Sequence, residues 1–262
     1  MNVKKIVDRF FEFFNLKIIK KQSYDSLIKE ASFGIHDRDF IVSVCDEANW
    51  KGILDCIPYS KSQLRQDIFV LSVLGFKKSG YFVEFGATDG VHLSNTNILE
   101  KKYFWKGILA EPAILWHEQL RNNRDCHIET SCVWSVSGEN LMFNEAEEGE
   151  LSTIGQYLEA DSHSEARKDS KEYMVETISL NDLLAKYQAP RDIDYLSIDT
   201  EGSEYEILRN FDFDTYNIKV ITCEHNYSPI REKIFDLLIA NGYERVYENI
   251  SKFDDWYVKA TY

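Results

Sequence analysis

Acidic residues and glycines occur together at the end of an apolar run. The segment FVEFGATDG, residues 82–90, contains Glu84 and Asp89 beside Gly86 and Gly90. Glycine lets the backbone turn sharply and approach a ligand closely. In an open parallel sheet, ligands bind beyond the carboxyl ends of the strands. This turn is therefore the expected place for a small cofactor, although a glycine-rich turn can also merely connect a strand to a helix.

Glu111 adds a second part to this pattern. It follows the next apolar run, about twenty residues after Gly90, where an acidic side chain can accept hydrogen bonds from both hydroxyls of a ribose. The fingerprint G-x-G-x-x-G is absent, and Asp89 would place a negative charge where a pyrophosphate requires donors. A nucleoside that carries a cation fits better. We therefore expect S-adenosylmethionine, with its sulfonium and ammonium groups near Glu84 and Asp89.

A second acidic group follows later strand-like runs. The segment IDTEGSE, residues 198–204, contains Asp199, Glu201 and Glu204, and the run at 218–223 is followed by Glu224 and His225. Carboxylates that crowd together repel one another, which argues against a packing role for Asp199 and Glu201. A solvated turn is the alternative for those two residues, and capping of the following helix is the alternative for one carboxylate of the group.

If such a cofactor donates its methyl group to an alcohol, the acceptor oxygen must be positioned and its proton removed. His225 is the predicted general base because imidazole titrates near neutral pH, with Asp199 or Glu224 orienting it or serving instead. A structural or surface histidine is the open alternative. Asp199, Glu201 and Glu224 also offer hard oxygen ligands for Mg²⁺, but no spacing demands a metal. We assign no metal-binding residue and keep a divalent cation as the weaker alternative.

The elements that must position these residues alternate along the chain. We expect four strands at residues 81–85, 107–110, 193–198 and 218–223. We expect three helices, from Ser62 to about 76, at 203–210 and at 229–241. Residues 243–248 and 255–260 should form a terminal hairpin. Ser203 and Glu206 have the spacing of a capping box. Strands that alternate with helices predict an α/β fold with a mainly parallel sheet covered on both faces.

Two regions fall outside this alternation. Residues 3–21 predict an amphipathic basic helix that packs on the domain or on a second subunit, or binds an anionic membrane surface. We assign residues 1–60 to an N-terminal helical extension and residues 61–262 to the catalytic domain. Residues 144–170 are charged and predict a surface insertion.

Composition limits the class of protein. The 262 residues suffice for one α/β domain, and the formal net charge of −14 argues against a nucleic-acid surface. The five cysteines contain no C-x-x-C pair, and no apolar run approaches the ~20 residues that span a bilayer. We expect a cytoplasmic protein, which could also lie on the inner face of the membrane if the N-terminal helix binds lipid.

An ordered series of segments carries a family resemblance. These segments are SQLRQD (62–67), FVEFGATDG (82–90), SNTNILE (94–100), WKGILAEP (105–112), IDYLSIDTEGSEYEIL (193–208) and ITCEHN (221–226). Over roughly residues 62–259 the chain resembles the FkbM family of S-adenosylmethionine-dependent methyltransferases. The resemblance implies a class I methyltransferase (Rossmann-like) fold with seven strands, the last antiparallel. It also implies O-methyl transfer to a hydroxyl of a sugar, glycan or natural product.

The resemblance also implies roles for individual residues. It places Glu84, Gly86, Asp89 and Gly90 around the methionine part of the cofactor, Ser94 and Asn95 near its amino-acid end, Glu111 at the ribose, Val133 near the adenine, and Asp199 beside the methyl group. Ser94 and Asn95 could instead cap a helix.

Two other classes of function remain open at this point. One is a nucleotide-dependent oxidoreductase, which the missing phosphate fingerprint disfavours. The other is a non-catalytic, methyltransferase-like module that binds a partner through the N-terminal helix and residues 144–170. The sequence does not specify the acceptor, although Trp116, Trp134, Tyr157 and Tyr227 could stack on a sugar face.

Overall fold

The computed structural model describes residue 34 and residues 36–146, 153–154 and 170–261. Residue contacts divide the chain into two units, residues 1–42 and 43–262. Of the first unit, residues 34 and 36–42 are described, and they are helical. The helix predicted at 3–21 lies outside the described residues. Its membrane or self-association role, and the extension assigned to residues 1–60, stay predictions.

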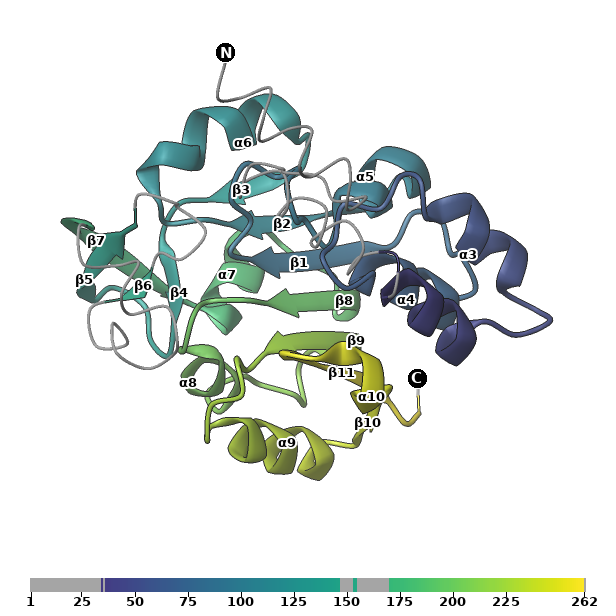
Figure 1. Cartoon of the computed structure of the whole chain (residues 1–262). Coiled ribbons are helices and arrows are strands. Elements are labelled where there is room, and N and C mark those ends of the chain that lie inside the picture. Colours follow the sequence, from purple (N-terminus) through teal and green to yellow (C-terminus); the bar gives the residue numbers. More distant parts are fainter. Residues whose placement is uncertain (1–33, 35, 147–152, 155–169, 262) are drawn as a thin grey trace, which may run out of the picture. The chain divides into compact units, whose positions relative to one another are not determined.

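A seven-stranded, mostly parallel sheet forms the centre of the second unit (Figure 1). Its order is β10-β11-β9-β8-β1-β2-β3, and only β11 runs antiparallel to its neighbours. The strands are β1 (Tyr81–Phe85), β2 (Lys106–Ala110), β3 (His127–Glu129), β8 (Asp192–Ile198), β9 (Asn217–Glu224), β10 (Tyr243–Val246) and β11 (Asp254–Lys259). This arrangement agrees with the predicted α/β class, with the four predicted strands and with the terminal hairpin.

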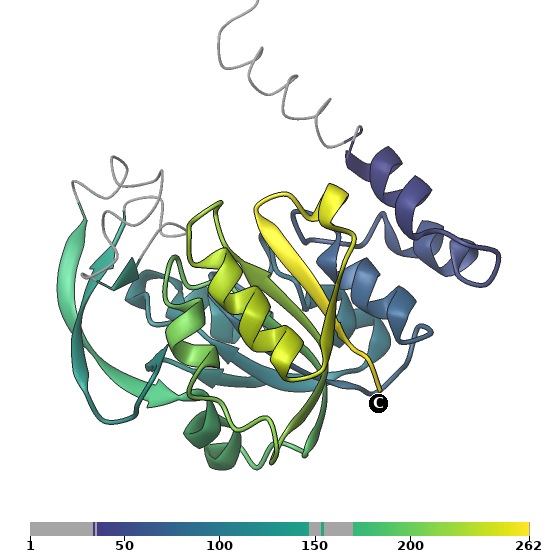
Figure 2. The same cartoon turned by 90° about the horizontal axis from the view of Figure 1, so that it is seen from below.

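Helices cover both faces of this sheet (Figure 2). The helices of this unit are α3 (Trp50–Cys56), α4 (Gln66–Val73), α5 (Asn97–Tyr103), η1 (Ile114–Trp116), α6 (His117–Asn123), α7 (Leu180–Lys186), α8 (Glu204–Leu208), α9 (Arg231–Ala240) and α10 (Glu248–Ser251). None of the described helices is long and apolar enough to cross a membrane.

Alternation along β1 assigns each side chain to one face of the sheet. Val83 and Phe85 belong to the buried apolar cluster that α7, α8 and α9 complete. Phe82 and Glu84 therefore point to the opposite face, because successive side chains of a strand alternate. On that side Phe69 of α4 stacks on Trp256 of β11, with ring centroids 4.6 Å apart. Both faces of the central strands are thus buried.

The register of the parallel strands aligns their carboxyl ends. Phe85 of β1 pairs with Ala110 of β2, Glu84 pairs with Ser197 of β8, and Ile198 pairs with Cys223 of β9. The residues that follow, among them Gly86, Glu111 and Asp199, consequently lie along one edge of the sheet. The sequence prediction of a shared edge is correct for these strands.

A second sheet lies beside the first and was not predicted. Its order is β4-β7-β5-β6, formed by β4 (Cys132–Trp134), β7 (Lys171–Ser179), β5 (Asn140–Glu145) and β6 (Thr153–Ile154). Val133, expected after the third strand, is within β4 of this sheet. The predicted insertion at 144–170 includes the end of β5 and all of β6, while residues 147–152 and 155–169 lie outside the described residues.

The helix boundaries differ from the sequence expectation, and the helix predicted at 203–210 is the shorter α8, Glu204–Leu208. The helix predicted from Ser62 begins at Gln66, and that predicted from Pro229 begins at Arg231. The predicted capping box is also wrong. Ser203 is the N-cap residue of α8, but its hydroxyl donates to Thr200 Oγ1 at 2.7 Å and does not cap the helix.

Candidate active site

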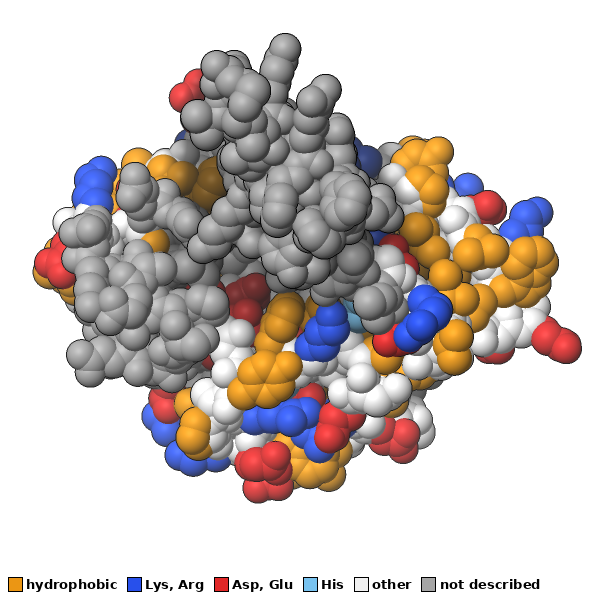
Figure 3. Space-filling view, in the orientation of Figure 1, with side chains coloured by type: hydrophobic (Ala, Val, Ile, Leu, Met, Phe, Trp, Pro, Cys, Tyr) orange, Lys and Arg blue, Asp and Glu red, His pale blue; other side chains and the backbone are white. Residues whose placement is uncertain are grey.

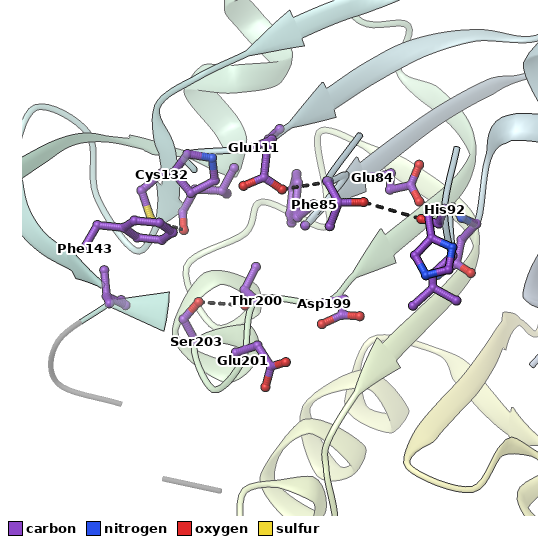
Figure 4. A pocket seen from close by; sticks show the side chains of 18 residues that line it. Glu84, Phe85, His92, Glu111, Cys132, Phe143, Asp199, Thr200, Glu201 and Ser203 are labelled. Carbon is purple, nitrogen blue, oxygen red and sulfur yellow. Dashed lines mark hydrogen bonds between the residues drawn. The ribbon is translucent and has the colours of Figure 1, made fainter. Parts of the chain in front are cut away.

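A pocket opens at the carboxyl edge of the sheet, between the ends of β1, β2 and β8 and the second sheet (Figure 4). It is lined by Glu84, Phe85, Gly86, Thr88, His92, Leu93, Asn95, Ala110, Glu111, Pro112, Cys132, Val133, Phe143, Ile154, Asp199, Thr200, Glu201 and Ser203. We call it the first pocket. The space-filling view shows acidic side chains in a shaded recess near the middle of the molecule (Figure 3). The turn after β1 thus borders a cavity, as the sequence predicts.

Glu111 lies in the wall of this pocket and is held by the backbone. Its Oε2 accepts a hydrogen bond from the Thr88 amide at 2.8 Å, and its Oε1 accepts one from the Ala113 amide at 2.8 Å. Burial raises the pKa of Glu111 to about 7 despite these two donors. Each oxygen keeps a further lone pair for a ligand hydroxyl. The carboxyl group is therefore oriented for a polar ligand.

Asp199, Glu201 and Glu224 gather at the ends of β8 and β9. One carboxylate oxygen from each lies within 4.8 Å of the others. Burial, followed by the negative charges of Asp199 and Glu201, raises the pKa of Glu224 well above its usual value, and Glu224 is hydrogen-bonded to Asp199. Burial and the neighbouring charges therefore favour the protonated form of Glu224, which is hydrogen-bonded to Asp199. The three oxygens also suit a divalent cation, as the sequence allowed.

Glu84 is buried at the pocket wall, and its carboxyl oxygens accept hydrogen bonds from its own chain. Its Oε1 accepts from the Asn95 amide at 2.7 Å, and its Oε2 accepts from the hydroxyls of Ser94 and Thr96 at 3.1 and 2.5 Å. Burial raises the pKa of Glu84, and the positive charge of Arg124 opposes that shift. The SNT segment therefore holds a buried carboxyl group. The structure supports neither a cofactor contact nor a helix cap for Ser94, which is absent from the pocket wall.

Asn95 differs from Ser94 because it lines the pocket. Its Nδ2 donates to Ser197 Oγ at 2.9 Å, whereas its Oδ1 is buried without a hydrogen-bond partner among the described residues. An unsatisfied buried acceptor costs free energy unless a ligand supplies a donor. This atom is therefore a candidate contact for a ligand N–H or O–H group.

The positions of Asp89 and Gly90 differ from the prediction. Asp89 Oδ1 accepts from the amides of Val91 and His92 at 2.8 and 2.7 Å, so the carboxylate stabilises its own turn. Gly90 packs on α6, where a Cβ would lie 2.6 Å from Arg124 Cγ. Neither residue lines the pocket. The acidic lining expected from Asp89 is absent.

His225 is likewise turned away from the pocket. Its ring is buried, Nδ1 accepts from the Tyr227 amide at 2.9 Å, and Nε2 lies 3.7 Å from Asp255. Burial lowers the pKa of His225. It lines none of the pocket wall described above, so the geometry does not support its predicted role as general base. Glu204 is also structural: its Oε1 accepts from the amides of Thr200 and Gly202 at 3.0 Å.

The second sheet supplies an apolar wall that the sequence did not reveal. Cys132 and Val133 come from β4, and Phe143 pairs with Ile154 across β5 and β6. Val133 thus lines the pocket from this second sheet, and its place near the adenine stays a prediction. The missed residues come from short strands that pair over long separations, which leaves little local signal.

Backbone strain marks the same pocket. Thr88, Leu93 and Glu201 line it with φ angles of 46°, 55° and 56°, in the left-handed region that non-glycine residues rarely adopt. Such conformations cluster at ligand sites. Sequence reasoning missed Thr88, His92 and Leu93, although Thr88 and His92 stand within or beside the GATDG turn.

Comparison with known proteins agrees with this geometry. A comparison with curated proteins found no match. The family model described as "Methyltransferase FkbM domain" matches residues 84–256, from β1 into β11. The match covers the turn after β1, the carboxyl ends of β2, β8 and β9, and the second sheet. The chain therefore belongs to the FkbM methyltransferase domain family.

Proposed function

We propose that this methyltransferase uses S-adenosylmethionine to methylate a hydroxyl group of a sugar, glycan or natural product. The observation that carries the proposal is the oriented Glu111 carboxyl group, which faces Asp199 across the first pocket (Figure 4). A ribose presents two neighbouring hydroxyls, and a carboxylate with fixed orientation is suited to accept from both. The cofactor supplies an electrophilic methyl group on a positively charged sulfur.

The residues of the pocket divide the work by their chemistry. Glu111 binds the ribose, while Val133, Phe143 and Ile154 form the apolar surface for the adenine. Gly86 lets the backbone approach the methionine part. Asp199 provides negative charge for the sulfonium and ammonium groups.

Proton removal is the task of the Asp199–Glu224 pair. Two carboxyl groups that share a proton retain one negative charge, and that charge receives the proton of the acceptor hydroxyl. The charge of Glu201 raises the affinity of the pair for this proton. If Mg²⁺ enters the cluster, Asp199, Glu201 and Glu224 are the residues that would hold it.

Calorimetry with S-adenosylhomocysteine tests the cofactor assignment. We expect Glu111→Ala to weaken binding at least about tenfold, or 1.4 kcal/mol. Glu118→Ala is the matched control, because Glu118 is an exposed acidic residue on α6. Equal affinity of wild type and Glu111→Ala would remove the assignment.

Product mass spectrometry tests the reaction. Cell extracts incubated with the protein and isotope-labelled S-adenosylmethionine should yield methyl ethers, in which one acceptor hydroxyl group carries the labelled methyl group. Binding of the cofactor without any labelled product would favour a non-catalytic module instead.

A further inference from the structure

A second pocket adjoins the first at Asp199. It is lined by Gln63, Gln66, Leu93, Asn95, Ser197, Ile198, Asp199, Thr222, Glu224, Phe253 and Asp254. Leu93, Asn95 and Asp199 line both pockets. A molecule in the second pocket would therefore lie next to one in the first, with Asp199 and Glu224 beside it.

The fold explains why these groups meet. Asp199 follows β8 and Glu224 ends β9, while Asp254 begins β11, which runs in the opposite direction. The start of β11 consequently reaches the same edge as the carboxyl ends of β8 and β9. Asp254 pairs directly with Glu224 in the register of the two strands.

The wall of this pocket is polar and acidic. It contains the amides of Gln63, Gln66 and Asn95, and the carboxyl groups of Asp199, Glu224 and Asp254. No lysine, arginine or histidine of the described residues lines it. Such a lining offers many hydrogen bonds but no counter-charge for an anion.

Asp254 and Asp255 are neighbours in β11, but in the described ranges arginines pair only with Asp255, which lies outside this pocket. Asp255 points away and forms ion pairs with Arg231 and Arg245, at 2.7 and 3.3 Å. Asp254 is buried, and its Oδ2 accepts from Gln66 Nε2 and Trp256 Nε1, both at 3.1 Å. Among the described residues no cation pairs with Asp254. The arginines of this region thus neutralise one face of β11 only.

One acceptor atom in the shared wall is unused. Asn95 Oδ1 is buried without a partner in the described part of the chain. Its amide nitrogen is fixed by Ser197, so the oxygen cannot turn to another donor without breaking that bond. A ligand hydroxyl or ammonium group would satisfy it, whereas a fully ionised phosphate has no donor to offer.

We propose that the second pocket binds the methyl acceptor and selects a hydroxylated molecule that is uncharged or cationic, excluding phosphorylated acceptors. This inference rests on the proposed function. The acceptor oxygen forms a bond to the methyl carbon as the sulfur–methyl bond breaks, and the hydroxyl proton passes to the Asp199–Glu224 pair. Gln66 and Asp254 are specificity-determining residues in this scheme.

Fractionated extract tests the acceptor class. An extract of cells that lack this chain is separated by anion exchange into neutral or cationic and anionic pools, and each pool is incubated with the protein and labelled S-adenosylmethionine. Label in the neutral or cationic pool supports the proposal. The proposal is overturned if only the anionic pool becomes labelled and if phosphatase treatment of that pool before the incubation abolishes the labelling. No label in any pool contradicts hydroxyl methylation itself, while S-adenosylhomocysteine binding reports separately on the first pocket.

Two variants test the pocket directly. Asp254→Asn preserves shape, and should raise the apparent KM for the labelled pool about tenfold while affinity for S-adenosylhomocysteine changes less than about twofold. The assignment is overturned if the KM is unchanged, or if the affinities for acceptor and for S-adenosylhomocysteine fall by the same factor. Gln63→Lys, at an exposed rim position, adds a cation and should allow methylation of phosphorylated acceptors. If Gln63→Lys leaves the ratio of anionic to neutral products unchanged, charge does not set the specificity.

Discussion

The backbone of Gly86 lies against the carbonyl oxygen of Asp199, so closely that a Cβ on Gly86 would lie 2.2 Å from that oxygen. This contact joins the ends of β1 and β8 directly beneath the first pocket. Gly86 also has a φ of +72°, which a side chain rarely tolerates. Both facts require glycine at this position.

Gly86→Ala should therefore displace β1 from β8 and weaken cofactor binding. We expect the loss of stability to exceed about 1 kcal/mol, with a loss of S-adenosylhomocysteine affinity of about tenfold or more. Thermal unfolding and calorimetry measure the two effects. Gly138→Ala is the matched control, because Gly138 has a φ of +81° and no atom within 4 Å of its Cβ position. Equal effects of the two variants would show that the Asp199 contact has no special role.

Glu111 should make both stability and binding depend on pH. Its pKa in the folded protein is about 7, against an ordinary value of 4.5, so the folded state holds the proton more tightly. The resulting stability is complete below pH 4.5 and is lost as the pH rises through 7. Relative to Glu111→Gln, wild type should lose up to about 3 kcal/mol of unfolding free energy between pH 5 and about pH 9. Urea unfolding at both pH values measures this difference.

Cofactor affinity should change in the opposite sense. In the proposed function the Glu111 carboxylate accepts from both ribose hydroxyls, so binding of S-adenosylhomocysteine should strengthen as the pH rises through about 7. In Glu111→Gln the affinity should be weak and nearly constant over the same range. A wild-type affinity that is independent of pH would contradict this role for Glu111.

Arg124 should matter for folding more than for chemistry. Its side chain is fully buried and donates to Glu100 Oε2 at 2.7 Å, Thr96 Oγ1 at 2.8 Å and the Gly90 carbonyl at 3.0 Å. Arg124→Met leaves Glu84 buried without its cation and leaves Glu100 with Lys101 alone, and should destabilise the protein by about 3–5 kcal/mol. Arg121→Met changes an exposed residue on the same helix and should cost less than about 0.5 kcal/mol. Chemical denaturation of the two variants is the measurement, and similar losses would refute the network.

Substitutions at Glu224 and His225 should separate the base from its neighbour. Glu224→Gln removes a member of the proton-sharing pair and should lower kcat about 10²–10⁴-fold. His225→Asn keeps an acceptor for the Tyr227 amide and should leave kcat within about threefold, with a lower melting temperature. Steady-state kinetics with saturating cofactor distinguish them. A collapse of kcat in His225→Asn, with normal unfolding, would restore His225 as the base.

The central sheet could be predicted because strands buried on both faces leave short, mostly apolar runs, such as residues 81–85 and 193–198. Their carboxyl ends then meet by topology, which is why Glu111 and Asp199 were placed beside one cavity. The direction of turn side chains could not be read in this way. Asp89 and His225 satisfy backbone amides of their own turns, and that choice depends on local geometry that residue type does not specify.

Two further features depended on contacts between distant segments. Ser94 binds a buried carboxyl group, which the alternation along β1 could have indicated, since Glu84 and Phe85 must face opposite sides of the sheet. The second sheet joins β4 to β7, and Cys132 pairs with Thr177 far along the chain. Strands of three residues carry almost no periodic signal, so the apolar wall of the pocket could not be predicted.

The position of Asp199 in the walls of both pockets has a consequence for the binding of cofactor and acceptor. A sulfonium ion in the first pocket would favour the ionised form of the Asp199–Glu224 pair, and so prepare the second pocket to take a proton. By reciprocity, whatever strengthens one binding event through this carboxylate strengthens the other equally. Cofactor and acceptor should thus each bind more tightly when the other is present, and the neutral thioether left after transfer should loosen the methylated product.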